Sequence, residues 1–318
     1  MSDTARPEVL VAASLPPVTM AALGLAFTTY RLSDEDALAR VRGMAASTLA
    51  GPIGPAMLDR LPALEVIANF GVGYDNIDVA AAVERGIVVT NTAGVLDEEV
   101  ADLTLGLLLA TLRRIPAAER FLRDGLWAKG SFALSPSLRG RRVGIVGLGG
   151  IGKAVARRLE GFAVEIAYHG RSRQADVAYP WYPTVVALAQ ACDVLIVIVP
   201  GGASTRHMID AQVLEALGPA GVLINVSRGT VVDEPALVAA LEAGSILAAG
   251  LDVFEREPVV PGGLLALDNV VLLPHVGSGS VLTRAAMGQA MVDNLSAWFA
   301  SGDAPNVVPE TRHLIRGL

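Results

Sequence analysis

The chain has 318 residues, of which 52% are hydrophobic and 18% are charged, and its formal net charge is −7. This length can bury full hydrophobic cores in two domains, which excludes a largely disordered chain. An acidic balance without clustered Lys and Arg argues against a nucleic-acid partner. The single cysteine, Cys192, excludes disulfides within the chain and a thiolate metal site.

The N-terminal residues do not combine basic residues, an apolar run and a small-residue cleavage site, so no export signal is predicted. The most apolar segment, residues 103–112, is too short to span a bilayer. We therefore expect a cytoplasmic protein without a membrane partner. Because the composition is unusually apolar for a monomer, we also expect a subunit interface.

Short apolar segments alternate with helical patterns along most of the chain, as is typical of parallel sheets covered by helices on both faces. The longest helical pattern spans residues 98–123, and Pro116 is expected to kink or divide it. A last helix is expected over residues 280–300. The sequence predicts strands over residues 8–13, 64–70, 86–91, 142–146, 164–168, 193–199, 221–225, 248–253 and 270–273.

A glycine-rich turn follows the strand predicted at residues 142–146. It has the sequence Gly147-Leu148-Gly149-Gly150-Ile151-Gly152 and leads directly into a helical pattern. The first glycine of such a fingerprint permits the tight turn, the second lets the backbone approach a pyrophosphate, and the third allows close packing of the helix. The helix N-terminus then supplies N–H donors to the phosphates. The segment therefore predicts dinucleotide binding.

The next predicted strand, residues 164–168, ends in His169-Gly170-Arg171-Ser172-Arg173. An NAD site usually has Asp or Glu at this strand end to bind the ribose 2′-hydroxyl. No acid stands there, since Glu165 lies at the start of the strand, whereas Arg171, Ser172 and Arg173 suit a 2′-phosphate. The sequence therefore favours NADP(H), with His169 as a further contact. The alternative is that both arginines are solvated loop charges.

Three later segments each follow an apolar strand and therefore fall at the carboxyl edge of a parallel sheet, where open α/β sheets bind ligands. They contribute Arg228, Glu257 and His275. This set suits the reduction of a 2-keto acid. Arg228 can hold the carboxylate and polarise the keto oxygen, His275 can donate a proton, and Glu257 can keep the imidazole protonated.

Several motifs in order, over residues 60–308, resemble the D-isomer-specific 2-hydroxyacid dehydrogenase family. Within it the chain is most similar to NADPH-dependent glyoxylate/hydroxypyruvate reductases and plant-type hydroxyphenylpyruvate reductases. The segments that carry the resemblance are Tyr168-His169-Gly170-Arg171-Ser172, Gly250-Leu251-Asp252-Val253-Phe254-Glu255-Arg256-Glu257-Pro258 and Asn269-Val270-Val271-Leu272-Leu273-Pro274-His275.

The resemblance implies two Rossmann-like or flavodoxin-like doubly wound parallel-sheet domains with a cleft between them. It implies a discontinuous substrate-binding domain of residues 1–98 and 289–318 and an NADP-binding Rossmann domain of residues 99–288. It also implies a homodimer that buries helices of the coenzyme domain.

The same resemblance assigns roles to individual residues. Arg228, Glu257 and His275 are the implied catalytic residues, with Glu257 rather than Glu255 as the partner of the histidine. The backbone N–H groups of Val72 and Gly73 are implied to bind the substrate carboxylate. Further cofactor contacts are implied for Asp252, Pro200, Thr205, Val226, Gly277 and Ser278.

Two positions depart from the family pattern. Asp97 stands where the family usually has Thr, and we expect its carboxylate to point away from the anionic substrate or to be paired. In the loop before the fingerprint, Trp127 alone matches the several tryptophans of the animal-type glyoxylate/hydroxypyruvate reductases. His207 and His313 are interpreted as surface residues without convergent partners.

The sequence thus predicts an NADPH-dependent reductase that converts glyoxylate or hydroxypyruvate to the D-2-hydroxy acid, with His275 as general acid. Phenylpyruvate-type or sugar-derived 2-keto acids such as 2-ketogluconate are the alternative substrates. A non-enzymatic, dinucleotide-sensing corepressor is a remote alternative. Such proteins recognise NAD and carry an extended tail, whereas Arg171 and Arg173 of this chain suit NADP(H). No metal is expected, since His and Cys ligands do not cluster.

Overall fold

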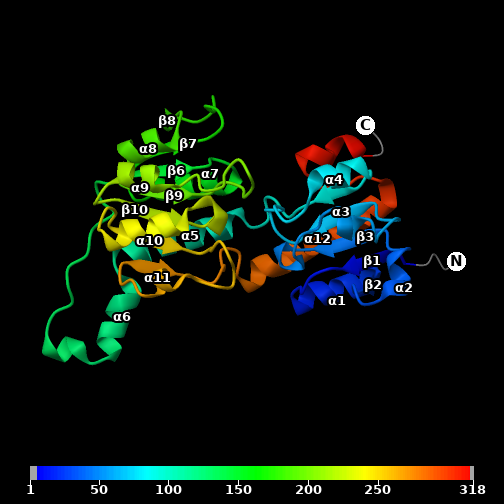
Figure 1. The fold of residues 1–318 in the computed structure, drawn as a ribbon, viewed down its shortest axis with the longest axis horizontal. Helices are drawn as coiled ribbons and strands as arrows, with labels where there is room; N and C mark the ends of the chain where they lie inside the picture. Colours follow the sequence, from blue (N-terminus) through cyan, green and yellow to red (C-terminus); the bar gives the residue numbers. More distant parts are fainter. Residues whose placement is uncertain (1–5, 316–318) are drawn as a thin grey trace. The chain divides into compact units, whose positions relative to one another are not determined.

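The computed structural model describes residues 6–315, and this part of the chain divides into two compact units (Figure 1). The divisions fall between Leu96 and Asp97 and between Ser278 and Gly279. The first unit therefore combines the N-terminal third of the chain with its C-terminal segment, and the second unit is continuous.

The first unit is built on a parallel sheet in the order β2-β1-β3-β4-β5. This is a flavodoxin-like order, which reverses between β1 and β3. The strands are β1 (Glu8–Val11), β2 (Thr28–Tyr30), β3 (Gly43–Ala46), β4 (Val66–Asn69) and β5 (Val88–Thr90). The helices are α1 (Pro17–Ala26), α2 (Glu35–Leu38), α3 (Pro55–Leu58), α4 (Val79–Glu84), α12 (Val281–Ser301) and the 3₁₀ turns η1 (Thr48–Ala50) and η4 (Pro309–Leu314).

Two groups of helices cover this sheet. The long helix α12 packs on α1 and on β4. Helices α2, α3 and α4 bury Leu38, Leu58 and Ala82 in one core cluster with strand residues such as Met44 and Ile67. Because strands β3 and β4 are buried along their whole length, their sequences are apolar without alternation, as expected for a parallel sheet covered on both faces.

The second unit holds a longer parallel sheet in the order β12-β11-β10-β9-β6-β7-β8. Its strands are β6 (Arg142–Val146), β7 (Glu165–His169), β8 (Trp181–Tyr182), β9 (Val194–Val197), β10 (Val222–Asn225), β11 (Ala248–Leu251) and β12 (Val270–Leu272). Its helices are α5 (Asp97–Leu112), α6 (Ile115–Arg123), α7 (Gly150–Glu160), α8 (Val185–Ala191), α9 (Ala211–Leu217), α10 (Glu234–Glu242), α11 (Gly262–Leu265) and the 3₁₀ turns η2 (Leu126–Lys129) and η3 (Gly229–Val231).

Helices α5 and α7 pack together in the second unit, and α8, α9 and α10 form a separate packed row (Figure 1). The order of the sheet reverses between β6 and β9, the point at which Rossmann folds bind dinucleotides. The predicted fold class of two doubly wound parallel sheets is thus confirmed. No helix among residues 6–315 combines the length and the apolar character needed to cross a membrane.

The boundaries of several elements differ from those expected. The domain boundaries expected after residues 98 and 288 fall within helices α5 and α12. The expected domain ends at residues 1 and 318 lie outside the described residues. Helix α12 begins after its N-cap, Ser280, and is continuous, so it belongs with the first unit on which it packs. The strands β2, β3 and β8 were not predicted. The segments Thr28-Thr29-Tyr30 and Trp181-Tyr182 contain no aliphatic run, and Gly43-Met44-Ala45-Ala46 contains no β-branched residue.

Pro116 was expected to kink or to divide the long helical pattern, and the structure shows that the pattern is divided into two helices. Helix α5 ends at Leu112, Arg114 adopts a left-handed conformation with φ 52°, and α6 begins at Ile115. Proline is tolerated in the first turn of a helix, since no intrahelical N–H bond is lost there. Pro116 therefore starts the second helix and does not kink one long helix.

Candidate active site

The glycine-rich turn joins β6 to α7 at the reversal point of the second sheet. Gly147 has φ +99°, and a Cβ there would lie 2.4 Å from the carbonyl oxygen of Ile198. A Cβ on Gly152 would lie 2.2 Å from the carbonyl oxygen of Gly147. Both positions therefore require glycine. A Cβ on Gly149 would meet no atom within 4 Å, which leaves its backbone open to a ligand.

This geometry fits the pyrophosphate of a dinucleotide. Gly149 is the N-cap of α7 and provides no side-chain cap, and Gly150, Ile151 and Gly152 form the first helical turn. The N–H groups of such a turn and the positive end of the helix dipole favour an anion. Leu148 is buried beneath the turn.

Asp97, which replaces the usual Thr, lies beside the same helix end. A Cβ on Gly150 would be only 2.1 Å from Oδ2 of Asp97. The carboxylate is thus packed against the first turn of α7, where the helix dipole stabilises negative charge. We expected this carboxylate to point away from the substrate or to be paired. The structure places it beside the glycine-rich turn.

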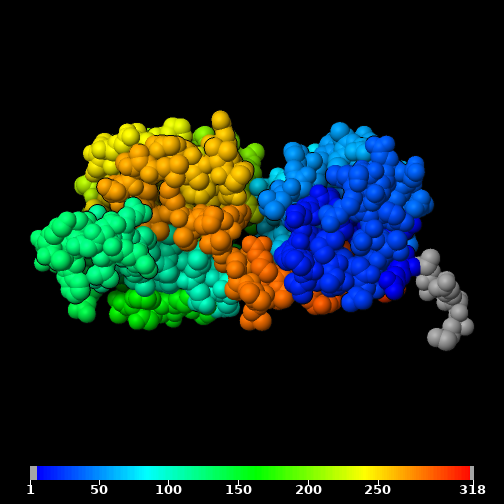
Figure 2. Space-filling model, turned by 90° about the horizontal axis from the view of Figure 1, so that it is seen from below, coloured from blue at the N-terminus to red at the C-terminus, as the bar shows by residue number. Residues whose placement is uncertain are grey.

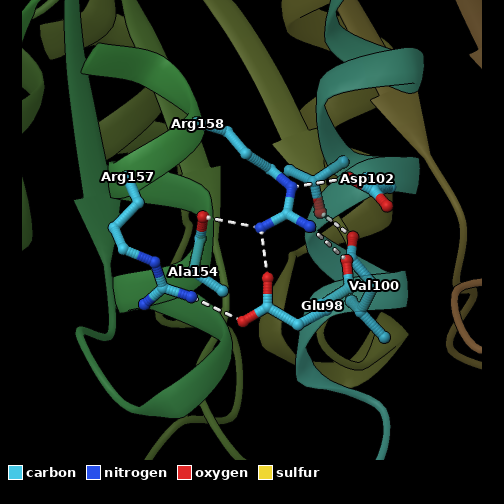
Figure 3. A network of polar contacts seen from close by, with 7 residues as sticks. Glu98, Val100, Asp102, Ala154, Arg157 and Arg158 are labelled. Carbon is cyan, nitrogen blue, oxygen red and sulfur yellow. Dashed lines mark hydrogen bonds and ion pairs between the residues drawn. The ribbon is translucent and has the colours of Figure 1, made fainter. Parts of the chain in front are cut away.

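An ion-pair network connects the first turns of α5 to α7 (Figure 3). The guanidinium of Arg158 lies 2.7 Å from Oε2 of Glu98 and 2.6 Å from Oδ1 of Asp102, and that of Arg157 lies 2.5 Å from Oε1 of Glu98. The hydrogen bond from Arg158 lowers the pKa of Glu98 most strongly, and partial burial opposes this effect. The network holds the start of α5, and with it Asp97, against the dinucleotide-binding helix.

The end of β7 carries the residues predicted for the adenosine side of the cofactor. The Nδ1 atom of His169 lies 3.0 Å from the carbonyl oxygen of Tyr182 and must donate to it, which fixes the tautomer. Arg171, Ser172 and Arg173 are exposed in the following loop. Within residues 6–315, neither arginine forms an ion pair, so both guanidinium groups are available to a phosphate.

The other predicted cofactor residues lie at the carboxyl ends of β9 to β12. The hydroxyl of Thr205 donates to the carbonyl oxygen of Pro200, and Val226 is buried directly after β10. Asp252 is almost completely buried, and its two carboxylate oxygens accept the N–H groups of Val276 and Gly277, each at 2.8 Å. Burial raises the pKa of Asp252, and these two hydrogen bonds oppose the shift. The loop through Gly277 to Ser278 is thereby attached to β11.

His275 and Glu257 form a hydrogen-bonded pair at this edge of the sheet. Nδ1 of His275 lies 2.7 Å from Oε2 of Glu257, and Oε1 of Glu257 accepts the N–H of Phe254 at 3.0 Å. Burial raises the pKa of Glu257, but the hydrogen bond and charge of His275 outweigh it, so the pKa lies below its ordinary value. Glu257 is therefore ionised, Nδ1 carries a proton, and Nε2 is left for a substrate.

Arg228 lies directly before η3, beside this pair. Its charge contributes to the lowered pKa of Glu257. Its backbone is held because its carbonyl oxygen accepts from Nδ2 of Asn225 at 3.0 Å. The structure therefore brings Arg228, Glu257 and His275 together, as their positions after three different strands suggested.

Val72 and Gly73 belong to the first unit, in the loop after β4. The carbonyl oxygens of this loop are bound by two asparagines, since Nδ2 of Asn69 donates to Gly71 and Gly73 and Nδ2 of Asn91 donates to Val72. In the described part of the chain, the N–H groups of Val72 and Gly73 form no hydrogen bond. The loop thus presents N–H donors, as an anion site requires.

A cavity of about 600 Å³ lies in the first unit at the carboxyl ends of β1 and β3, where the strand order reverses. Its lining includes Ser14, Ser47 and Phe70, and the guanidinium of Arg284 lies 5.7 Å from the ring centroid of Phe70. These residues were not predicted as site residues from the sequence. Their signal is weak, because single serines after short strands are common in any α/β chain.

One histidine was misjudged. Nε2 of His207 lies 3.6 Å from Oε1 of Glu255, and its Nδ1 lies 3.9 Å from Oδ2 of Asp233. It therefore has convergent acidic partners, contrary to expectation. His207 and these two partners lie in three separate loops, and the sequence does not show that the loops meet.

Comparisons with known proteins agree with this geometry. Residues 105–277 match the model of the D-isomer specific 2-hydroxyacid dehydrogenase, NAD binding domain. A glyoxylate/hydroxypyruvate reductase of Arabidopsis thaliana is 50% identical over 82% of this chain and 83% of its own length. A hydroxyphenylpyruvate reductase of Plectranthus scutellarioides is 51% identical over 77% of this chain and 78% of its own.

Among solved structures, an NADPH-dependent glyoxylate/hydroxypyruvate reductase from Sinorhizobium meliloti, in complex with NADP and malonate, has a TM-score of 0.93 and 53% identity. The match covers 99% of both chains, so both units of the present fold have their counterparts in that enzyme. The resemblance noted in the sequence is thus confirmed by family model, by relatives and by structure. The chain belongs to the D-isomer specific 2-hydroxyacid dehydrogenase family of oxidoreductases.

Proposed function

We propose that this protein is an NADPH-dependent reductase that converts glyoxylate and hydroxypyruvate to D-2-hydroxy acids. The observation that carries the proposal is the His275–Glu257 pair, 2.7 Å long, beside Arg228 and at the same sheet edge as the glycine-rich turn. This arrangement combines a proton donor, a fixed cation and a dinucleotide site. The names of the plant and Sinorhizobium relatives support the substrates and the cofactor.

Bound NADPH supplies the hydride to the keto carbon. The residues of the chain manage charge and protons. Glu257 accepts the Nδ1–H of His275 and so directs the Nε2–H toward the keto oxygen. As negative charge develops on that oxygen, His275 transfers its proton, while the guanidinium of Arg228 stabilises the charge. The N–H groups of Val72 and Gly73 bind the substrate carboxylate.

The preference for NADPH rests on the end of β7. Arg171 and Arg173 lie in the exposed loop after this strand. The strand ends in His169 and not in an acid, which would repel a 2′-phosphate. A 2′-phosphate is absent from NADH, so these contacts favour NADPH alone. Ser172 adds a hydroxyl donor to the same group.

The test is a steady-state assay of glyoxylate, hydroxypyruvate, hydroxyphenylpyruvate and 2-ketogluconate, each with NADPH and NADH. We expect the highest kcat/KM for glyoxylate or hydroxypyruvate with NADPH and a D-configured glycerate product. Arg228→Ala and His275→Ala should each lower kcat by about 10²–10⁴-fold and leave the Kd of NADPH nearly unchanged. Full activity in either variant would contradict the assignment.

A second candidate is a reductase of bulkier 2-keto acids, such as hydroxyphenylpyruvate or 2-ketogluconate. The cavity of about 600 Å³ in the first unit favours it, because glyoxylate has no substituent to occupy such a volume. Phe70 and Arg284 offer this cavity an aromatic ring and a cation. A higher kcat/KM for the bulkier acids, reduced selectively by Arg284→Met, would establish this candidate instead.

We further propose that the protein is a cytoplasmic homodimer that associates through α6 and η2. This segment projects from the second unit (Figures 1 and 2), and no residue of α6 is buried. Ile115, Leu122 and Trp127 in this segment are 52%, 56% and 69% exposed, and Leu134, in the loop that follows η2, is 99% exposed. Such a patch is characteristic of an interface. Light scattering should give about twice the mass of one chain, and Leu122→Glu with Trp127→Glu should give a monomer.

A further inference from the structure

Glu255 precedes the catalytic loop residue Glu257 by two positions and receives contacts from three other segments of the second unit. Its N–H donates to Oε1 of Glu234 at 2.8 Å, and its carboxylate accepts from Nη2 of Arg206 at 2.6 Å. Glu234 begins α10, and Arg206 lies in the loop between β9 and α9. Glu255 is therefore anchored from both its backbone and its side chain.

The third contact comes from the turn that follows Arg228. A Cβ on Gly229 would lie 1.8 Å from the carbonyl carbon of Phe254 and 2.1 Å from the nitrogen of Glu255. The turn that carries Arg228 thus rests directly on the backbone of Phe254 and Glu255. That backbone also holds Glu257, because the N–H of Phe254 donates to Oε1 of Glu257. A shift of Glu255 would therefore move both Arg228 and the partner of His275.

We infer that the ion pair of Arg206 and Glu255 is a positioning device that sets Glu257 against His275 for proton transfer. The inference rests on the proposed reductase function. Arg206 and Glu255 touch none of the reacting groups in it. They act by fixing the loop on which the proton-donating pair depends. The side chain of Glu234 holds the same loop, because it accepts the backbone N–H of Glu255.

The exposure of the two side chains separates a positioning role from a stabilising one. The side chain of Glu255 is 20% exposed and that of Arg206 is 53% exposed. An ion pair with one half-exposed partner contributes little to folding stability. A displacement of about 1 Å at a reacting group, in contrast, can lower a rate by about 10²-fold. Loss of the pair should therefore be seen in turnover and not in the melting temperature.

The experiment compares the full-length protein with Arg206→Met, Glu255→Gln and Arg206→Lys. We expect kcat to fall by about tenfold or more in the first two variants and to recover partly in the third. KM for the keto acid and for NADPH should stay within about twofold, and the alkaline limb of the kcat–pH profile should move to lower pH. Arg85→Met is the matched control, because it removes an ion pair of 2.7 Å with Asp59 in the first unit.

A second measurement does not depend on turnover. In protein labelled with ¹⁵N-histidine, the downfield Nδ1–H resonance of His275, assigned by its loss in His275→Asn, reports the hydrogen bond to Glu257. We expect this resonance to broaden or move in Arg206→Met and Glu255→Gln and to remain unchanged in Arg85→Met. If wild-type protein reduces none of the keto acids, the proposed function fails, and the resonance still tests the positioning role.

Three results would overturn the inference. The first is an unchanged kcat and resonance in both variants. The second is a fall in kcat matched by an equal loss in Arg85→Met. The third is a rise in KM for NADPH alone, since Arg206 follows Thr205, a predicted cofactor residue, and such a rise would show that Arg206 acts through the cofactor.

Discussion

At the scale of single residues, the pKa values of carboxylates in this chain are shifted in different directions by what surrounds them. Glu257 is held ionised by His275, whereas burial raises the pKa of Asp252 and of Glu234. Asp252 uses its oxygens to accept two backbone N–H groups, and these hydrogen bonds hold the loop that follows His275. Similar residues after neighbouring strands thus serve either chemistry or architecture.

Asp97 provides a prediction at this scale. Its carboxylate lies against Gly150, in the turn proposed to bind the pyrophosphate, and two negative groups at one helix end repel each other. Asp97→Asn keeps the shape and removes the charge, so the Kd of NADPH should fall by about fivefold. Fluorescence titration measures this change. Asp124→Asn, an exposed carboxylate after α6, should leave the Kd unchanged, and equal effects would contradict the assignment.

Cys192 provides a second prediction. Burial raises the pKa of its thiol to about 12, so the reactive thiolate is essentially absent at pH 8. Iodoacetamide at pH 8 should therefore leave the native protein unmodified over an hour and label it fully in guanidinium chloride. Mass spectrometry gives the extent of labelling. Rapid labelling of the native protein would show that the thiol is accessible.

At the scale of elements, the position of the dinucleotide helix depends on its partner helix. Arg158 connects α7 to Glu98 and Asp102 of α5 (Figure 3), and its side chain is only 23% exposed. Helix α5 also lines the second sheet, because Thr111 and Leu107 pack against Gly250 of β11. The network therefore attaches the glycine-rich turn to an element that is itself fixed on the sheet.

This network predicts a pH-dependent stability. Because the pKa of Glu98 is lower in the folded chain than its ordinary value, folding favours the ionised carboxylate. The contribution is present above the ordinary pKa and is lost as the pH falls through the lowered folded-state value. Arg158→Met should lower Tm by about 2 °C at pH 7 and by less at pH 3.

The control for that measurement is the exposed ion pair of Arg60 with Glu35 in the first unit. Arg60→Met should change Tm by less than Arg158→Met at pH 7, since exposed ion pairs contribute little to stability. If Arg158→Met lowers Tm equally at pH 7 and pH 3, packing of the aliphatic part of Arg158 matters more than its charge.

At the scale of the whole molecule, the chain concentrates positive charge locally although its net charge is −7. Arg171 and Arg173 lie at one strand end, and Arg228 lies at another. Ligand binding should therefore stabilise the folded protein in a cofactor-specific way. At a concentration 100 times its Kd, NADPH should add about 2.7 kcal/mol to the free energy of unfolding.

Differential scanning fluorimetry tests this. NADPH should raise Tm by several degrees and NADH by less at equal concentration, because NADH has no 2′-phosphate for the two arginines. The double variant Arg171→Ala with Arg173→Ala should remove most of the difference and leave the effect of NADH intact. Equal losses for both cofactors would show that these arginines are not phosphate ligands.

The sequence by itself determined the parallel-sheet architecture, the glycine-rich turn and the candidate residues Arg228, Glu257 and His275. It could do so because every strand of a parallel sheet ends at the same edge, so that residues after strands converge without knowledge of packing. Apolar strands and glycines that tolerate no Cβ can be recognised from the local sequence. Strands without an aliphatic run, such as β2 and β8, cannot be recognised in this way.

Only the tertiary structure decided how residues distant in the chain meet. It placed Asp97 against Gly150, set Oε2 of Glu257 on His275, and joined Glu234 and Arg206 at Glu255. It also assigned all of α12 to the first unit. Hydrogen bonds and ion pairs depend on distances of a few tenths of an ångström, and these follow from the packing of whole elements. Residue order alone carries no such distances.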